Sequence, residues 1–225
     1  MIDIHTHVLQ GIDHGANNLE ESLEMLKQLE DTGITKVYCT SHYYSDTEPE
    51  NSFLTRYNEA FDLLKSEYKG KIELLKGAEV HISPFFGIGE IENLCLENTS
   101  IMLIEFPFWH DVPYWAYDVM EKLIQIGITP IIAHVERYVG ARKKRVIKKF
   151  NKMGVLMHVD STAIVEGDRF VDWCIKKSYV TIVASDYHHE IPYVPIIDAI
   201  RVIEKKYGKE IAENICSAPD KLLGQ

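Results

Sequence analysis

The sequence is poor in cysteine and has no long apolar run. Its four cysteines, Cys39, Cys95, Cys174 and Cys216, lie far apart and form no CxxC pair. This spacing argues against a disulfide framework and is typical of reduced thiols in a cytosolic protein. No apolar run reaches the ~18 residues that a membrane span requires, and no signal peptide precedes the first apolar segment. We therefore expect a soluble, cytoplasmic protein that does not insert into a membrane.

Positive charge is also scarce. The 225 residues include 24 Lys and Arg against 34 Asp and Glu, a formal net charge of −10. Because a nucleic-acid-binding domain normally presents a basic face, we expect no nucleic-acid partner. The hydrophobic content of 46% is enough for a sizeable core, and no long linker or low-complexity segment interrupts it. The sequence therefore predicts a single domain over residues 1–225.

Short apolar, β-branched runs alternate with amphipathic segments along the whole chain. We predict strands over residues 1–5, 34–40, 71–79, 100–106, 128–135, 154–161 and 179–186, and helices over residues 18–33, 51–70, 113–127, 139–153, 167–177 and 192–207. The first helix has an Asn18–Glu21 capping box at its start. Strands that alternate with helices predict an α/β fold with a parallel sheet.

Polar side chains stand at the carboxyl ends of nearly all of these strands. They are His5, His7, His42, Glu79, Glu105, His134, Asp160, Asp186 and His188. In a (β/α) barrel the active site is built at this rim from several strands, whereas an open sheet concentrates its ligands at one switch point. The distribution favours a barrel.

The same residues suit a metal centre. His5 and His7, two apart on a strand, point to the same face, and carboxylates such as Glu79 and Glu105 are costly to bury unless they are paired or bind metal. Each of them alone could equally be a satisfied core histidine or an ion-pair partner. When His14 is added to the residues at the strand ends and Asp160 is left out, nine candidate ligands remain, which is too many for one mononuclear site. Imidazole and carboxylate without thiolate suit Mn, Fe or Zn, and clustered metals of this kind catalyse phosphate ester hydrolysis.

The motifs HTHVLQGIDHG, TSH, GAE, LIEF, ITPIIAHVERY and VASDYH follow one another along the chain. In this order they resemble the PHP (polymerase and histidinol phosphatase) superfamily. Within it they look most like the bacterial manganese-dependent tyrosine-protein phosphatases of capsular and exopolysaccharide operons. The resemblance implies a distorted (β/α)7 barrel similar to a TIM barrel, and three divalent metal ions, manganese first, with iron or zinc as alternatives.

The resemblance also implies how the ligands divide. It gives His5, His7, Glu79 and Asp186 to the first metal, His14, His42 and His188 to the second, and Glu79, Glu105 and His134 to the third. It makes Arg137 the residue that grips the substrate phosphate, a role that suits a planar guanidinium. The alternative for Arg137 is a surface salt bridge with Glu136. If the reaction needs a general acid, His42 or His188 is the candidate.

Three features depart from the family pattern. His14 stands where an aspartate is usual, and Asp160 where an asparagine is more usual. No arginine lies between Asp186 and Arg201, where the family carries a second phosphate-binding arginine. Candidates to replace it are His189, Arg142 and Arg169. Aromatic residues near the strand ends can stack on a substrate phenol or simply pack the loops: Tyr43, Tyr44, Phe85, Phe86, Phe108, Trp109, Tyr138 and Tyr187.

The function implied is a phosphatase that acts on phosphotyrosine in proteins. The expected partner is a bacterial tyrosine kinase that regulates capsule or exopolysaccharide synthesis. One alternative is a small-molecule phosphatase similar to histidinol phosphatase. Another is a non-catalytic PHP module that holds metal for a structural or partner-binding purpose, although such modules lose ligands and all nine positions here carry competent ones.

Overall fold

The computed structural model describes residues 1–84, 86–87, 91–107, 112–138 and 142–224. Its strands are β1 (Ile2–Thr6), β2 (Lys36–Cys39), β3 (His42–Tyr44), β4 (Glu73–Lys76), β5 (Glu79–His81), β6 (Ile101–Glu105), β7 (Thr129–Ile132), β8 (Leu156–Asp160) and β9 (Ile182–Ala184). Every pairing between them is parallel, as the alternation of strands and helices predicts.

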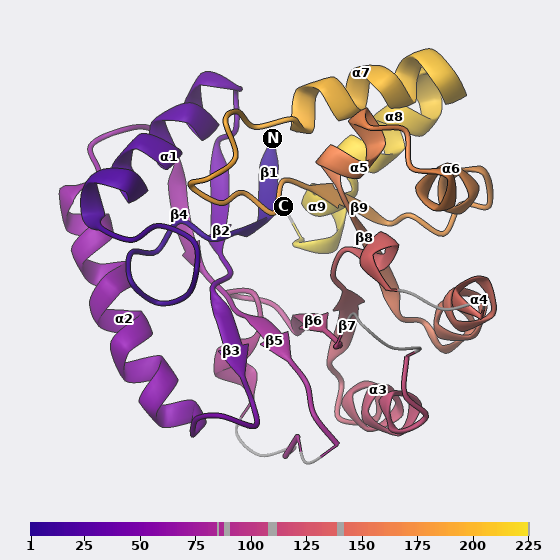
Figure 1. Ribbon diagram of the computed structural model, residues 1–225, viewed down its shortest axis with the longest axis horizontal. Coiled ribbons are helices and arrows are strands. Elements are labelled where there is room, and N and C mark those ends of the chain that lie inside the picture. Colours follow the sequence, from indigo (N-terminus) through magenta and orange to yellow (C-terminus); the bar gives the residue numbers. More distant parts are fainter. Residues whose placement is uncertain (85, 88–90, 108–111, 139–141, 225) are drawn as a thin grey trace.

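The strands form two sheets that close on each other. One has the order β1-β2-β4 and the other the order β3-β5-β6-β7-β8-β9. The chain after β9 returns to β1 through a parallel bridge between Thr6 and Tyr187. Asp186 N donates to His5 O over 2.9 Å, and His7 N donates to Tyr187 O over 3.0 Å. The predicted distorted barrel is therefore confirmed, with helices around its strands (Figure 1).

The distortion lies where β2 gives way to β3 and β4 to β5. The strand predicted over 34–40 is confirmed as β2, but β3, which follows it, was not predicted. The prediction of one continuous strand over 71–79 was wrong, because that strand ends before Gly77 and restarts as β5. Gly77 packs closely against Leu96, because an added Cβ would lie 2.9 Å from Leu96 Cδ2 and would require that side chain to shift. At these breaks β2 and β4 stay with β1, while β3 and β5 join the larger sheet.

The helices are α1 (Leu19–Asp31), α2 (Glu50–Glu67), α3 (Trp115–Gln125), α4 (Lys143–Met153), α5 (Ser161–Val165), α6 (Arg169–Lys176), α7 (Ile196–Tyr207), α8 (Lys209–Cys216) and α9 (Ala218–Leu222), with 3₁₀ turns η1 (Glu92–Leu94) and η2 (Val135–Arg137). The cap of the predicted capping box is confirmed, because Asn18 Oδ1 accepts from Glu21 N over 3.0 Å, whereas the Glu21 carboxylate accepts from Asn17 N rather than from Asn18 N. The first residues of the helix predicted over 139–153 lie outside the described part. No helix among the described residues is long and apolar enough to span a membrane.

Two apolar clusters form the core. The larger one joins most of the strands to the surrounding helices α1 to α8. The smaller one contains strand residues such as Ile4, Tyr38 and Leu103, and Leu222 and Leu223 at the chain's C-terminal end pack against it. At the carboxyl ends of the strands the buried side chains include polar ones: His5, His7, His42, Glu79, Glu105, His134 and Asp186.

Candidate metal centre

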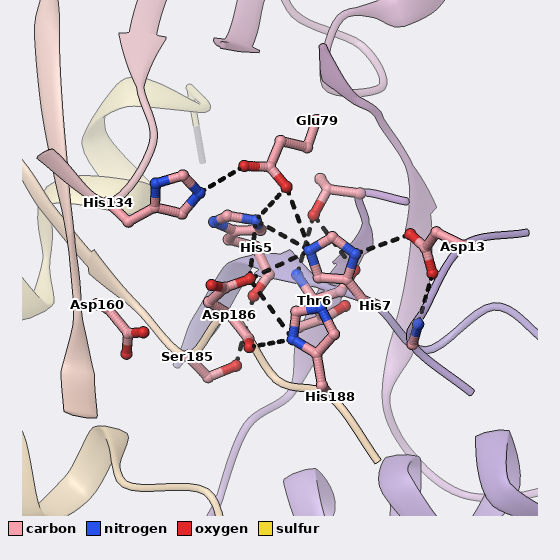
Figure 2. Close-up of polar contacts among 12 residues, drawn as sticks. His5, Thr6, His7, Asp13, Glu79, His134, Asp160, Ser185, Asp186 and His188 are labelled. Atoms are coloured by element: carbon pink, nitrogen blue, oxygen red, sulfur yellow. Dashed lines mark hydrogen bonds and ion pairs between the residues drawn. The ribbon is translucent and has the colours of Figure 1, made fainter. Parts of the chain in front are cut away.

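The first predicted ligand group comes together at the centre of the barrel rim (Figure 2). His5 Nε2 lies 3.1 Å from Glu79 Oε2 and 3.2 Å from Asp186 Oδ1. His7 Nε2 lies 3.3 Å and 3.1 Å from the same two oxygens. The two imidazole nitrogens are 3.1 Å apart. Four donor atoms from three distant parts of the chain thus converge on one point, and they form a group that could hold a metal ion.

Glu79 also faces a second set of donors. His134 Nε2 lies 2.7 Å from Glu79 Oε1 and 3.5 Å from Glu105 Oε1. His42 Nδ1 approaches the same two carboxylates, at 3.2 Å from Glu79 Oε2 and 3.6 Å from Glu105 Oε2. The predicted group of Glu79, Glu105 and His134 therefore lies together, and His42 stands next to it.

The remaining predicted group is only partly assembled. The compact set of donors there consists of His7, His42 and His188. The ring of His14 is 5.0 Å from that of His42 and 4.5 Å from that of His188, centroid to centroid. His14 is exposed, unlike the others, and its nitrogens lie outside the compact set. It stands at the edge of the centre.

The buried donor atoms of this cluster fit a cation. Glu79 Oε2, Asp186 Oδ1, His42 Nδ1 and His188 Nε2 are buried and lack a hydrogen-bond partner. Burial, with the charges of Glu79 and Asp186, raises the pKa of Glu105 to about 9. Burial lowers the pKa of His42 to about 4 and that of His188 to about 3, so both imidazoles are neutral, as metal ligation requires. A divalent ion would relieve the repulsion among the carboxylates.

Two of the predicted ligands have unusual backbone conformations. His134 has a φ of 28° and Asp186 a φ of 50°, a region that residues other than glycine rarely adopt. The amide of His134 donates to His158 Nδ1 over 2.8 Å, and His158, on β8, is fully buried. Sequence reasoning missed His158, although a histidine inside the apolar strand GVLMHVD follows the same pattern as the residues that were found.

Asp13 is a second residue that sequence reasoning missed. Its Oδ2 accepts from His7 Nδ1 and from His42 N, both over 2.8 Å, and its Oδ1 accepts from Gly15 N over 2.8 Å. Although burial acts in the opposite direction, His7 and His42 hold the pKa of Asp13 well below its usual value. The carboxylate fixes the proton of His7 on Nδ1 and turns Nε2 toward the cluster. The sequence did contain a sign of this role, because Asp13 directly precedes His14 in the motif HTHVLQGIDHG.

The loop that carries Asp13 and His14 is packed closely onto His7. A Cβ added to Gly15 would lie 2.0 Å from His7 O, so only glycine fits. Ala16 N donates to His7 O over 3.1 Å. His189, a predicted substrate contact, supports this loop: its Nδ1 hydrogen-bonds to Gly15 O and its Nε2 to Asn17 Nδ2. Both ring nitrogens of His189 are therefore engaged within the fold.

Arg137 lies at the edge of the cluster. Its Nη2 is 3.1 Å from Asp160 Oδ2 and also contacts the carboxylate of Asp186. Asp186 and Asp160 raise the pKa of Arg137 although burial acts in the opposite direction. Its ion pairs are thus with these two residues; Glu136, the alternative, instead accepts from Asp160 N over 3.0 Å. With 40% of its side chain exposed, the guanidinium is still accessible.

Most of the aromatic residues predicted near the rim are part of the core. Tyr43, Tyr138 and Tyr187 are nearly fully buried. Tyr43 donates to Glu48 O over 3.4 Å. Phe86 packs partly buried against the core, and Phe85, Phe108 and Trp109 lie outside the described residues. Tyr44, which is half-buried, stacks on His42 with 5.1 Å between ring centroids and remains beside the cluster.

A parallel α/β barrel with buried imidazoles and carboxylates at its carboxyl rim defines a metal-dependent hydrolase. The family model for capsular polysaccharide synthesis, CpsB/CapC, matches residues 1–224, and the chain belongs to this family.

Named relatives agree with this assignment. The chain is 28% identical over 241 residues to the tyrosine-protein phosphatase CpsB of Streptococcus agalactiae serotype V, covering 96% of this chain and 94% of the relative. It is 30% identical over 240 residues to the tyrosine-protein phosphatase YwqE of Bacillus subtilis, covering 99% and 91%. A chain from the crystal structures of YwqE from Bacillus subtilis and CpsB from Streptococcus pneumoniae, described as unique metal-dependent tyrosine phosphatases, superposes with a TM-score of 0.82. It is 26% identical, and the match covers 100% of this chain and 94% of the other.

Proposed function

We propose that this protein is a metal-dependent phosphatase that hydrolyses phosphotyrosine in proteins. Its substrate is a bacterial tyrosine kinase that regulates capsule or exopolysaccharide synthesis. The observation that carries the proposal is the convergence of buried imidazole and carboxylate atoms next to the accessible guanidinium of Arg137. The whole-length similarity to named tyrosine-protein phosphatases supports the substrate class.

The proposed cofactor is three divalent metal ions, manganese in preference to iron or zinc. His5, His7, Glu79 and Asp186 would hold the first, and His134, Glu79 and Glu105 the third, with Glu79 shared. His42 and His188 would hold the second, with His14 at its exposed side. Such ions, when bound, supply a hydroxide at neutral pH and polarise the phosphoryl oxygens.

Arg137 has the phosphate-binding role in this proposal. Asp160 and Asp186 hold its guanidinium against the cluster, where it would meet the phosphate oxygens with a matching planar fork. The phenol of tyrosine, with a pKa of ~10, leaves with little assistance. Of the two predicted proton donors, neither His42 nor His188 suits that role, because burial lowers the pKa of both and leaves the imidazoles neutral. Among the predicted aromatic contacts, Tyr44 offers a ring to the substrate phenol, whereas Tyr43 is engaged in the core.

The test uses the full chain stripped of metal and reloaded separately with Mn²⁺, Fe²⁺ and Zn²⁺. Phosphate release is measured from a phosphotyrosine peptide, a phosphoserine peptide and histidinol phosphate. We expect turnover of the phosphotyrosine peptide that depends on Mn²⁺. Arg137→Ala should lower kcat/KM about 10²–10³-fold, the usual effect of removing one donor to a developing anion. Arg201→Ala, which removes an exposed arginine paired with Asp198, is the control.

The other outcomes each select a different function. If histidinol phosphate is hydrolysed in preference to the phosphotyrosine peptide, the protein is a small-molecule phosphatase. Metal binding without turnover of any substrate would leave a non-catalytic module.

A further inference from the structure

The helix α4 is unusually basic for an acidic chain. Residues 137–159 contain no acidic side chain, whereas the whole chain has a net charge of −10. Seven of the 24 Lys and Arg lie between positions 142 and 152: Arg142, Lys143, Lys144, Arg145, Lys148, Lys149 and Lys152. Because charged faces of soluble proteins usually mix both signs, this concentration needs an explanation.

Within the part of the chain that the structure describes, these charges have no acidic partner. Among the ion pairs of the described residues, none involves any of the seven. Three of them lie over aromatic rings instead: Lys143 over Phe170 at 4.2 Å, Lys144 over Trp173 at 5.0 Å and Lys149 over Tyr117 at 3.4 Å. Such contacts hold the lysines in place and leave their charge uncompensated.

The basic helix forms one wall of a groove of about 870 Å³ between α3 and α4, which lie next to each other at the lower right of Figure 1. Arg145, Lys148 and Lys152 contribute to this wall. Tyr114 and Tyr117, at the start of α3, form the opposite wall, and Tyr114 is 81% exposed. The groove thus combines uncompensated positive charge with aromatic surface.

The two helices that line the groove start at the same rim of the barrel as the metal centre. In a parallel barrel, each helix after a strand starts at the carboxyl rim, where the donors lie. The cap of α4, Arg142, is five residues beyond Arg137, and α3 follows the strand that ends at Glu105. A protein chain with its phosphotyrosine at the centre would therefore extend toward this groove with the residues that flank the phosphotyrosine.

We infer that the groove between α3 and α4 binds an acidic segment that flanks the phosphotyrosine of the protein substrate. The inference rests on the proposed function. The 11 residues of α4 span about 16 Å, which matches roughly five residues of extended peptide. A concave groove with an aromatic wall suits a peptide better than the flat surface of a bilayer. Carboxylates along the peptide would supply the missing counter-charges.

The test compares two phosphotyrosine peptides of equal length, one with Glu and Asp in its flanks and one with Gln and Asn. The groove variant is Arg145→Gln/Lys148→Gln/Lys152→Gln, which leaves the lysines over aromatic rings in place. At 50 mM salt the variant should raise KM for the acidic peptide about tenfold, as expected for three weak surface ion pairs. Turnover of the neutral peptide and of free phosphotyrosine should stay within about twofold, and the preference should disappear in high salt.

The control variant is Lys27→Gln/Lys71→Gln/Lys205→Gln, which makes the same change in net charge on other surfaces. Binding of a fluorescent, unphosphorylated acidic peptide, followed by anisotropy, gives a readout that needs no catalysis. If no phosphotyrosine substrate is hydrolysed, the proposed function fails and anisotropy still decides on the groove. Equal losses in both variants, equal effects on both peptides, or binding of anionic phosphatidylglycerol vesicles with no preference for acidic peptide would each overturn the inference.

Discussion

Replacing Asp13 with asparagine should weaken metal binding, although Asp13 is not itself one of the candidate ligands and instead hydrogen-bonds to two of them, His7 and His42. Its two carboxylate oxygens accept three N–H groups, those of His7 Nδ1, His42 N and Gly15 N, each over 2.8 Å. The carboxylate thereby fixes the orientation of His7 and the position of His42 at once.

The size of the effect follows from counting donors. An amide has one oxygen, so in Asp13→Asn at least one of the three N–H groups faces an NH₂ group. A buried donor without a partner costs about 1–3 kcal/mol. A middle value of about 2 kcal/mol corresponds to roughly a 30-fold loss of affinity. This agrees with the 10–100-fold effect that is typical of residues that orient metal ligands.

The assay is calorimetric titration of the metal-stripped protein with Mn²⁺. Asp31→Asn, at the exposed end of α1, is the control because it makes the same charge change away from the centre. Unchanged affinity in Asp13→Asn, with folding intact by circular dichroism, would refute the argument that Asp13 orients His7.

Two further predictions concern the support of the ligands. Gly15→Ala should displace the loop from His7, because the new Cβ would lie 2.0 Å from His7 O. Thermal melting with and without Mn²⁺ should show a lower Tm and a smaller stabilisation by metal. The control Gly87→Ala should behave as wild type, because no atom lies within 4 Å of the added Cβ. His158→Ala should leave the amide of His134 without its partner and lower the free energy of unfolding by about 1–3 kcal/mol; urea denaturation measures this, and an unchanged midpoint would mean that His134 is held by other contacts.

Much of the barrel was predictable because strand and helix periodicity is a local property. The helix cap at Asn18 and the strand positions are examples. The separate strand β3 and the break before Gly77 were not predictable, because β2 and β4 stay with β1 while β3 and β5 join the other sheet. Whether an apolar run remains one strand depends on partners far away in the sequence.

The metal centre was predictable for a similar reason. Carboxylates and imidazoles at the ends of apolar strands can be read from the sequence, and parallel pairing brings strand ends together. The residues behind the ligands were harder to find. Asp13 and His158 act through the Nδ1 proton of one histidine and the backbone amide of another, and such contacts exist only once the chain has folded.

The position of Glu79 limits how this centre can change in evolution. Its two oxygens lie within 3.3 Å of nitrogens from four histidines, His5, His7, His42 and His134. Losing any one histidine removes one of these contacts, but losing Glu79 removes all four together. Replacement of one ligand by another is therefore least costly at the exposed edge, where His14 lies, and most costly at Glu79. Descendants of this chain should vary at position 14 long before they vary at position 79.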